Sequence, residues 1–594
     1  MSTYAAPLRD MLFTMKEVGG LDAVCAQPGH EETTPDVVEA ILEEAARFAA
    51  GELDPINYPG DQQGARWADG AVTAADGFRA AYEAFCANGW HGMPAATEWG
   101  GQGLPTLVST AVLEMWKSSN MAFSLCQMLT LGAVEAIAHH GSDALKRRFL
   151  APMVEGRWTG TMNLTEPQAG SDLAALRSRA VPDGDHYRVF GSKIFITWGE
   201  HDLAENIVHL VLARLPDAPP GVKGISLFVC PKFLVDDDGS LGARNDLACT
   251  SIEHKLGIHA SPTASMSFGE REGAIGYLVG EPHQGLACMF TMMNHARLNV
   301  GLEGVGIAER AYQRARAYAL ERVQGRPLLS GGKAIAGHPD VRRMLMDMKA
   351  RTEAMRALAY FCAGQMDRAH GHPEAAERAQ ATALVELLTP IVKGWCTDSA
   401  LPIASDGLQV HGGMGYVEET GAAQYLRDAR ITTIYEGTTG IQANDLIGRK
   451  LARDGGRTMG ALIRRIDGDA RRLLDAHDPG LAQVGRALHA AVHTLRDGAD
   501  WLLANSVERP ERCAAGAVPF LRLAGTVLGG WLSARLAEAA LAQLAAGGGD
   551  TAFLSAKLAT ARHYAAHVLV AAPMWRDIVV AGADSTLALA DEQL

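Results

Sequence analysis

Hydrophobic and polar positions along the first part of the chain follow a helical pattern. Between residues 36 and 157, apolar side chains recur at intervals of three and four, which places them on one face of a helix. Thr34 before Pro35 is a favourable helix start. The pattern predicts an N-terminal extension over 1–35 and a helical domain over 36–157, with helices at 35–49, 78–87 and 107–115.

The pattern changes at about residue 158. Short segments rich in β-branched and aromatic residues alternate with Gly, Pro and Asp, as in the apolar runs 207–212 and 225–229. These segments follow one another too closely for crossover helices to lie between them. We therefore expect a strand-rich domain over 158–280, folded as a β-barrel or a β-sandwich.

Helical spacing resumes near residue 284. Over 281–454 it predicts a helical bundle, with helices at 298–322, 341–361 and 376–395. Beyond 455 the chain is rich in Ala and Leu, and it predicts an additional helical domain over 455–594, with helices at 459–476, 481–505, 516–546 and 551–570. We expect this last domain to pack against the rest of the chain or a second subunit; an amphipathic membrane face is the alternative. The expected fold class is mainly α with a central β domain.

The composition is that of an ordinary globular protein of several domains. The chain has 594 residues, of which 48% are hydrophobic and 21% are charged, and its mean hydropathy is -0.01. Its net charge of -14 argues against a general nucleic-acid-binding surface. Nine cysteines occur without any CxxC pair, so neither a disulfide framework nor a zinc ribbon is indicated. The first sixteen residues lack a basic start followed by an apolar core, and we expect a cytoplasmic location.

Glu436 is a candidate general base. It follows the apolar pair Ile434-Tyr435 and precedes Gly437-Thr438, so its carboxylate lies at a flexible corner beside hydroxyl and N–H groups. Apolar walls disfavour the ionised form and would raise its pKa towards the range useful for removing a carbon-bound proton. A solvated loop charge is the alternative interpretation.

Two motifs near the start of the strand-rich domain carry groups suited to a flat cofactor. Thr165 and Ser171 lie in one turn and can direct hydroxyl and N–H groups at a heterocycle or a phosphate. Phe195 and Thr197 belong to an alternating strand, which places a ring and a hydroxyl on the same face. An ordinary turn and a core aromatic are the alternatives.

The second helical region carries groups suited to phosphate. Arg297, Arg322 and Arg326 can each bind phosphate oxygens, although solvated arginines are the more common outcome. The glycines that follow Gln409 in QVHGGMGY would let a phosphate approach the backbone closely.

Taken in order, these motifs are similar to those of one family. The segments LTEPQAGSD, KIFIT, HKLGIHASPT, the helix from NHAR to ERVQGR, QVHGGMGY and RDARITTIYEGTTGIQ have the order and spacing of the acyl-CoA dehydrogenase family. The chain resembles this family over roughly 40–450. With its N-terminal extension and its added C-terminal helices, it looks most like the 3-methylmercaptopropionyl-CoA dehydrogenase type within the family.

The resemblance implies a fold, a cofactor and a reaction. The family fold is a helical domain, a β-barrel and a helical bundle around FAD. By resemblance, Glu436 would remove the α-proton of an acyl-CoA while a hydride leaves the β-carbon for flavin N5, which gives a trans-2-enoyl-CoA. The backbone N–H of Glu436 and a flavin hydroxyl would stabilise the thioester oxygen as charge develops, and Gly437 would keep that N–H accessible. The electrons would pass to an electron-transferring flavoprotein.

The resemblance also assigns roles to particular positions. Arg322 would reach the FAD of a neighbouring subunit, so we expect at least a dimer. The residues expected at FAD are Leu164, Thr165, Ser171, Phe195, Thr197, Arg322, Gln409, Gly412, Gly413 and Thr438. Those expected at the acyl-CoA are Ser171, Asn294, Arg297 and Gly437. No metal is expected.

Three positions depart from the family pattern, and two other functions stay open. Gln324-Gly325 replaces an FG pair, Pro339 replaces a glutamine after His338, and Gly440 replaces another glutamine, each near the expected FAD. In an acyl-CoA oxidase, O2 would replace the flavoprotein partner. A catalytically silent flavoprotein that acts as a binding module is the other alternative, and the presence of Glu436 argues against it. The resemblance favours short to medium acyl chains, including a thioether acyl group.

Overall fold

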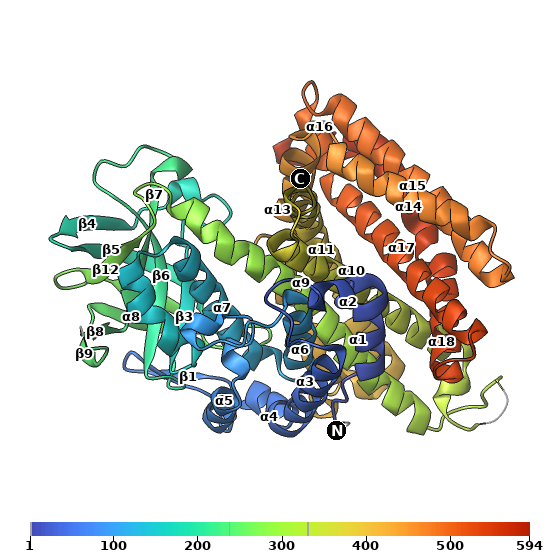
Figure 1. The fold of residues 1–594 in the computed structure, drawn as a ribbon, viewed down its shortest axis with the longest axis horizontal. Coiled ribbons are helices and arrows are strands. Elements are labelled where there is room, and N and C mark those ends of the chain that lie inside the picture. Colours follow the sequence, from blue (N-terminus) through green and yellow to red (C-terminus); the bar gives the residue numbers. More distant parts are fainter. Residues whose placement is uncertain (1–2, 237, 330–331) are drawn as a thin grey trace. The chain divides into compact units, whose positions relative to one another are not determined.

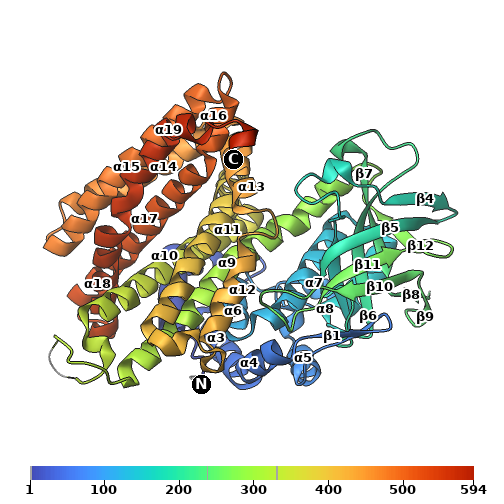
Figure 2. The ribbon, with the colours of Figure 1, turned by 180° about the vertical axis from the view of Figure 1, so that it is seen from behind.

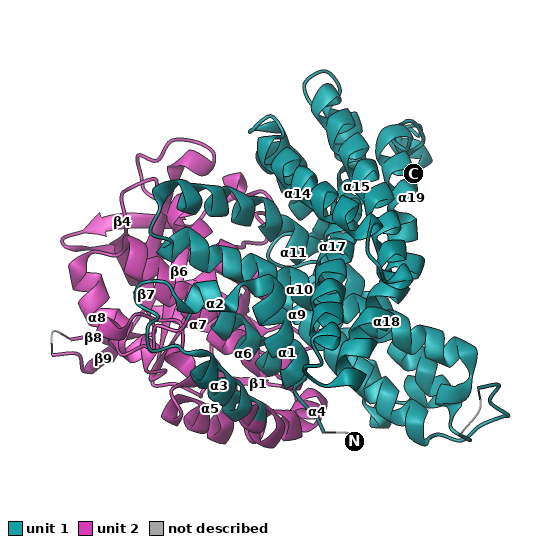
Figure 3. Cartoon of the chain, turned by 45° about the vertical axis from the view of Figure 1, so that its right-hand side comes forward, with its two compact units in different colours: residues 1–46, 105–118, 300–594 teal, residues 47–104, 119–299 magenta. Residues whose placement is uncertain are grey.

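The computed structural model describes residues 3–236, 238–329 and 332–594. The chain divides into two compact units (Figure 3). Unit 1 comprises residues 1–46, 105–118 and 300–594, and unit 2 comprises residues 47–104 and 119–299. Each unit is therefore built from segments that lie far apart in the sequence.

A closed ring of five strands lies at the centre of unit 2 (Figures 1 and 2). Strand β4 pairs with β5 along its length and also touches β6, so the order β4-β5-β12-β7-β6 returns to β4. Strand β3 extends the sheet beyond β6, and β11 and β10 extend it beyond β5. The sequence left barrel and sandwich open, and the structure has a barrel. Its strands are β3 Trp158–Asn163, β4 Arg179–Asp183, β5 His186–Thr197, β6 Asn206–Arg214, β7 Ile225–Pro231, β10 Leu247–Ile252, β11 Thr263–Phe268 and β12 Ala274–Val279.

The apolar runs identified in the sequence form the most buried strands. Every residue of β6 except Arg214 is buried, and β7 is buried throughout, because both faces of these strands are covered. They pair antiparallel, with Leu210 opposite Val229. Helix α7 packs on β3, and the Gly160 N–H donates to the hydroxyl of Thr130 over 3.0 Å. The other strands and α-helices of unit 2 are β1 Arg66–Ala68, β2 Ala71–Thr73, β8 Phe233–Val235, β9 Leu241–Arg244, α4 Asp54–Gln63, α5 Phe78–Ala87, α7 Met121–His140 and α8 Asp143–Val154.

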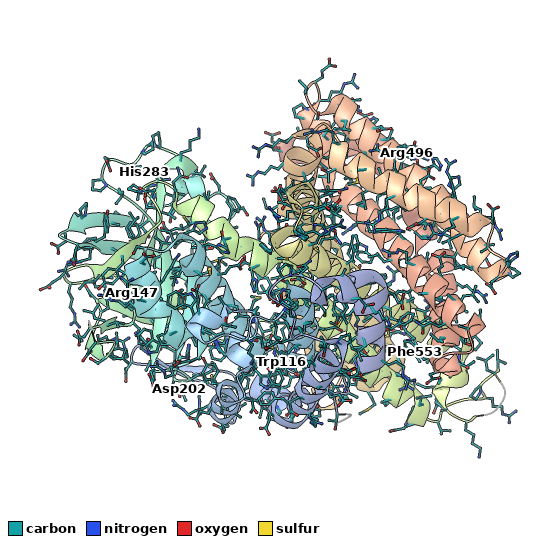
Figure 4. The ribbon with its side chains drawn as sticks, in the orientation of Figure 1. Trp116, Arg147, Asp202, His283, Arg496 and Phe553 are labelled. Atoms are coloured by element: carbon teal, nitrogen blue, oxygen red, sulfur yellow. The ribbon has the colours of Figure 1, made fainter. Side chains whose placement is uncertain are left out.

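Unit 1 is helical in its described part. Helices α14, α15 and α17 lie side by side in both ribbon views, and α17 also packs on α10 and α11 (Figures 1 and 2). Phe553 of α18, labelled in Figure 4, packs edge-on against Phe13 of α1, and the two ring centroids are 5.5 Å apart. The α-helices are α1 Leu8–Thr14, α2 Leu21–Cys25, α3 Pro35–Phe48, α6 Thr106–Ser119, α9 Gly285–Glu321, α10 Pro339–Gly371, α11 Ala375–His411, α12 Ala422–Thr432, α13 Thr439–Asn444, α14 Arg457–Leu474, α15 Pro479–Asn505, α16 Pro510–Ala515, α17 Ala517–Ala545, α18 Thr551–His567, α19 Ala572–Ala581 and α20 Ala583–Thr586, with α3, α6 and α9 shared with unit 2.

A buried ionic cluster joins α1, α6, α9, α10 and α18. Arg356 donates to the carboxylates of Glu114 over 2.6 and 2.8 Å, Glu309 over 2.7 Å and Asp10 over 2.6 Å. Asp10 also binds the ammonium of Lys557. Arg356, Glu114 and Lys557 are almost completely buried. The cluster therefore connects the N-terminal extension, the bundle and the C-terminal helices through charged groups that are shielded from water.

The helices of the bundle are longer than the sequence predicted. The stretch expected to be helical over 376–395 is part of α11, which continues to His411 although Pro390 and Pro402 lie inside it. Each proline removes one backbone donor. The surrounding residues Leu387, Ile391 and Ile403 are buried, so packing outweighs that loss.

Among the residues that the structure describes, two helices are long and apolar enough to cross a membrane. They are α7 Met121–His140 and α17 Ala517–Ala545, and 89% and 83% of their most apolar windows are buried inside the protein. Such burial is typical of core helices, which pass the same test of length and composition.

Candidate active site

Glu436 lies in a tight turn between α12 and α13. Its φ angle is +55° and that of Gly437 is +88°, so two consecutive residues adopt the left-handed conformation. A glycine tolerates this conformation, but a glutamate in it is strained by about 1–3 kcal/mol. The Thr439 N–H donates to the Thr433 carbonyl over 3.0 Å and closes the turn. The surrounding structure must therefore hold Glu436 in place.

Two buried side chains hold the backbone of this turn. The ammonium of Lys393 donates to the carbonyl oxygen of Gly437 over 2.6 Å, and the amide of Gln442 donates to the carbonyl oxygen of Glu436 over 2.9 Å. Lys393 and Gln442 are completely buried. With both carbonyls bound, the orientation of the peptide groups beside the carboxylate is fixed.

A third contact holds the residue that precedes Glu436. The hydroxyl of Tyr435 donates to Oε2 of Glu303, a completely buried residue of α9. Oε1 of Glu303 has no hydrogen-bond partner among the described residues. Burial raises the pKa of Glu303, although the charges of Lys117 and Lys393 and the Tyr435 hydroxyl oppose the rise. Burial also lowers the pKa of Lys117 to about 8.

Sequence reasoning identified Glu436 but missed the residues that support it. Glu303 and Lys393 are charged residues in helices that the spacing predicted, whereas Gln442 ends the quoted stretch RDARITTIYEGTTGIQ and was given no role. A charged residue on the apolar face of a predicted helix was the available signal, because such a residue is seldom buried without a partner. The identity of the partner was not available, since Glu303 and Tyr435 are 132 positions apart.

The other predicted site residues of unit 1 lie near helix ends. Gly412 and Gly413 follow the end of α11, and a Cβ atom built on either would meet nothing within 4 Å. Gly412 has a φ angle of +61°, and Gln409 is exposed. Arg322 is exposed immediately after α9. Open backbone beside exposed polar groups is what a phosphate contact requires.

Thr438 is part of the same turn as Glu436. Its hydroxyl oxygen accepts a hydrogen bond from the Ile441 N–H over 3.2 Å and caps α13. The structure thus brings Glu436, Gly437 and Thr438 into one turn.

In unit 2, a buried ion pair holds the turn that contains Leu164, Thr165 and Ser171. Lys193 donates to Glu166 over 2.9 Å and to the carbonyl of Leu164 over 3.1 Å. Burial alone would raise the pKa of Glu166, but Lys193 and hydrogen bonds from residues 177 and 178 outweigh burial and lower it to about 2. Sequence reasoning quoted both residues inside motifs but gave them no role.

The turn also contacts the strand that carries Phe195. The Ile194 N–H donates to the Thr165 carbonyl over 2.9 Å, so the two predicted cofactor segments are adjacent within unit 2. Leu164 is buried, whereas Ser171 is exposed.

The backbone at Phe195 departs from the regular strand that the sequence predicted. Its φ angle is +60°, and β5 contains a bulge opposite Ser265, where the pairing with β11 shifts by one residue. The side chain of Phe195 is 58% exposed, which is unusual for a phenylalanine. The prediction that Phe195 and Thr197 share a face assumed a regular strand, and the backbone departs from that geometry at the bulge.

Asn294 and Arg297 belong to the N-terminal half of α9. Asn294 is exposed, but Arg297 is buried and its guanidinium lies 6.0 Å from the ring centroid of Phe290. Three residues apart on a helix, they lie on neighbouring positions of one face.

The described residues include one histidine–aspartate group with the spacing of metal ligands. Nδ1 of His489 and Nε2 of His493 lie 3.0 and 3.6 Å from Oδ1 of Asp467. Arg496, which projects from α15 (Figure 4), contacts Nδ1 of His493 over 3.3 Å. A guanidinium can only donate, so the proton of His493 lies on Nε2 and occupies the position that a metal would need. Arg471 binds Asp467 as well. The group is therefore better described as an ion-pair cluster.

Comparisons with known proteins give a family match along most of the chain. Three models match in order: the acyl-CoA dehydrogenase N-terminal domain over residues 35–157, the middle domain over 161–270 and the C-terminal domain over 283–451. A fourth, described as acetyl-CoA dehydrogenase C-terminal like, matches residues 460–590.

Individual relatives cover nearly the whole chain. The 3-methylmercaptopropionyl-CoA dehydrogenase of Ruegeria pomeroyi is 49% identical, over 96% of both chains. Caenorhabditis elegans ACDH-11, solved in complex with C11-CoA, has a TM-score of 0.77 at 21% identity, over 98% of this chain and 95% of its own. A Bacillus anthracis acyl-CoA dehydrogenase complexed with FAD has a TM-score of 0.74 at 20% identity, over 93% of this chain and 89% of its own.

Proposed function

Since the chain belongs to the acyl-CoA dehydrogenase family, we propose that it is an FAD-dependent acyl-CoA dehydrogenase in which Glu436 removes the α-proton of an acyl-CoA thioester. The observation that carries this proposal is the Glu436 turn. A strained left-handed glutamate is held there by hydrogen bonds to its own carbonyl and to that of Gly437. Strain of this kind persists only where the surrounding structure enforces it, and it concentrates at functional sites.

The chemistry of the reaction explains why the base is fixed. The α-proton of a thioester is weakly acidic, so the carboxylate must stand at the correct distance and angle when the proton leaves. A backbone N–H directed at the thioester oxygen stabilises the charge that develops there. The N–H of Glu436 can serve, since Gln442 holds the next peptide group through the Glu436 carbonyl and Gly437 has no side chain to obstruct the approach.

FAD, when bound, supplies the acceptor for the hydride that leaves the β-carbon. The residues of this chain fit such a cofactor. The open backbone at Gly412 and Gly413 suits a phosphate, the exposed ring of Phe195 suits a flat heterocycle, and exposed Arg322 offers a guanidinium to an anion. We propose the other cofactor and substrate residues named from the sequence on the same basis.

The substrate and partners are proposed from the relatives. Identity of 49% over nearly the full length of the Ruegeria pomeroyi enzyme supports a short to medium acyl group, with 3-methylmercaptopropionyl-CoA as the first candidate. We propose an electron-transferring flavoprotein as electron acceptor, a homodimer as the assembly and the cytoplasm as the location.

An anaerobic titration tests the reaction and the substrate together. Purified protein is mixed with 3-methylmercaptopropionyl-, butyryl-, octanoyl- and palmitoyl-CoA, and the absorbance of oxidised flavin is followed. We expect bleaching, most readily by the first. A yellow protein that none of these thioesters bleaches would contradict the proposal. A parallel aerobic assay for hydrogen peroxide separates a dehydrogenase from an oxidase.

The Glu436→Gln substitution tests the base. The amide cannot accept the α-proton, so the bleaching rate is expected to fall by about 10²–10⁴-fold while FAD content stays normal. Glu419→Gln, at an exposed glutamate seventeen positions earlier in the chain, is the matched control and should leave the rate unchanged. Near-normal bleaching by Glu436→Gln would refute the assigned role.

A further inference from the structure

The C-terminal helical extension contacts a residue of the Glu436 turn through one aspartate. Arg522 of α17 donates to Oδ2 of Asp398 on α11 over 2.9 and 3.1 Å. The other oxygen of Asp398 accepts a hydrogen bond of 2.8 Å from the hydroxyl of Thr439. Asp398 therefore has one oxygen bound to the extension and one bound to the turn.

Close packing between α11 and α17 fixes Arg522 beside Asp398. A Cβ atom built on Gly525 would lie 2.1 Å from Trp395, so any larger residue would force the helices apart. Gly525 lies one turn after Arg522 on α17, as Asp398 lies one turn after Trp395 on α11. The guanidinium of Arg522 also lies 5.3 Å from the ring centroid of Trp575 on α19. The arginine is therefore held by elements of the extension on one side and by α11 on the other.

Thr439 is the residue at which this chain of contacts reaches the base. Its N–H closes the turn onto Thr433, and its hydroxyl binds Asp398. The left-handed residues Glu436 and Gly437 lie between Thr433 and Thr439 in the chain. Because a strained turn relaxes when its end is released, the position of Thr439 helps to determine the position of the Glu436 carboxylate.

We propose that Arg522 of the extension is a positioning residue for Glu436, acting through Asp398 and Thr439. This inference rests on the role proposed for Glu436. Arg522 does not contact substrate or cofactor in this arrangement; it neutralises Asp398 and orients the oxygen that holds Thr439. The extension thereby contributes to the active site as well as to packing.

Substitutions at two positions, Thr439 and Arg522, test the chain of contacts from opposite ends. Thr439→Val removes the hydroxyl and keeps the shape, whereas Thr439→Ser keeps the hydroxyl. Arg522→Met removes the charge and keeps much of the length. For Thr439→Val and Arg522→Met we expect the kcat of flavin reduction to fall roughly ten-fold with little change in KM, because a misplaced base slows the chemical step. Thr439→Ser should behave as the wild type, and the double variant should be no slower than the slower single variant.

Arg562→Met is the matched control. Arg562 binds Asp478 over 2.7 Å inside the extension, and its side chain is 43% exposed against 41% for Arg522. Loss of either ion pair should lower the melting temperature similarly, but only Arg522→Met should lower kcat. Equal kcat values for the two arginine variants, or equal loss in Thr439→Ser and Thr439→Val, would overturn the proposal.

Amide hydrogen exchange over residues 433–442 gives a readout that does not depend on turnover. We expect faster exchange in Arg522→Met and Thr439→Val than in the wild type and in Arg562→Met. Unchanged exchange in both variants overturns the positioning role even if the acyl-CoA reaction is confirmed. Faster exchange in a protein that no acyl-CoA bleaches would support the contacts while refuting the dehydrogenase assignment. Thr439→Val and Thr439→Ser keep the test intact if Arg522→Met does not fold.

Discussion

Unit 1 contains two buried groups of charges that differ in how completely they are paired. In the Arg356 cluster, both oxygens of Glu114 are bound, one by Arg356 and the other by Tyr360 over 2.6 Å. In the group around Glu303, Tyr435 binds one carboxylate oxygen and the other has no hydrogen-bond partner among the described residues. Each group thus includes a tyrosine that donates to a buried glutamate, but only the second adjoins the proposed base.

The pKa shifts of the two groups have opposite signs. Burial would raise the pKa of Glu309, but Arg356 outweighs burial and lowers it. Burial raises the pKa of Glu303, and the nearby lysines only reduce the rise. A fully paired charge is typical of a structural contact, whereas an incompletely paired one is tolerated where a function requires it. We infer that the Arg356 cluster serves stability and the Glu303 group serves the active site.

Removing the central arginine should have the largest effect. Arg356→Met removes the buried guanidinium that Glu114, Glu309 and Asp10 share, so we expect a loss of about 3–5 kcal/mol in the free energy of unfolding. Chemical denaturation measures it. Arg351→Met, which breaks a partly exposed pair with Asp347 on the same helix, should cost less than about 1 kcal/mol. Equal losses of stability in Arg356→Met and Arg351→Met would contradict the stabilising role inferred for the Arg356 cluster.

The two tyrosines provide the sharpest test of the comparison. Tyr360→Phe and Tyr435→Phe each remove one hydroxyl from a buried glutamate, and each should cost about 1–3 kcal/mol of stability. Tyr435→Phe should also lower the kcat of flavin reduction about ten-fold or more, because Tyr435 precedes Glu436. Tyr360→Phe should leave kcat unchanged. If both variants lose kcat equally, the functional distinction fails.

The smallest expected effect is on the pH dependence of stability. Glu309→Gln and Glu303→Gln should change this dependence in opposite directions. Because the pKa of Glu309 is lowered by folding, its contribution is present above the pKa of the unfolded chain and is lost as the pH falls. The wild type should therefore gain stability over Glu309→Gln as the pH rises. The pKa of Glu303 is raised, so the wild type should lose stability relative to Glu303→Gln as the pH rises. Each slope is at most about 1.4 kcal/mol per pH unit, and slopes of the same sign would contradict the comparison.

The sequence predicted those features that depend on neighbouring residues. Glu436 was identifiable because glycines and hydroxyls adjoin it in the chain. The four helices predicted in the extension agree with α14, α15, α17 and α18 to within about three residues, because their Ala- and Leu-rich stretches end at Pro and Gly, whereas the short helices α16, α19 and α20 were not predicted. The barrel strands β6 and β7 were recognisable as continuous apolar runs.

Features that depend on distant segments were missed. The bulge beside Phe195 arises from pairing with β11, about seventy residues later, so nothing in the local sequence indicates it. The helix α11 continues through two prolines because its neighbours bury it. The contact between Arg522 and Asp398 joins residues 124 positions apart, and nothing in either local segment indicates it.

The ion pair between Asp10 and Lys557 has a consequence for the synthesis of the protein. The two residues are 547 positions apart, so the ribosome makes one long before the other. At about 5–20 residues per second, Asp10 leaves the ribosome roughly half a minute to two minutes before Lys557 is added. The first helix of the nascent chain therefore cannot form its ion pair with Lys557 until translation is nearly complete. A message truncated before codon 557 would yield a chain whose first helix lacks this partner permanently.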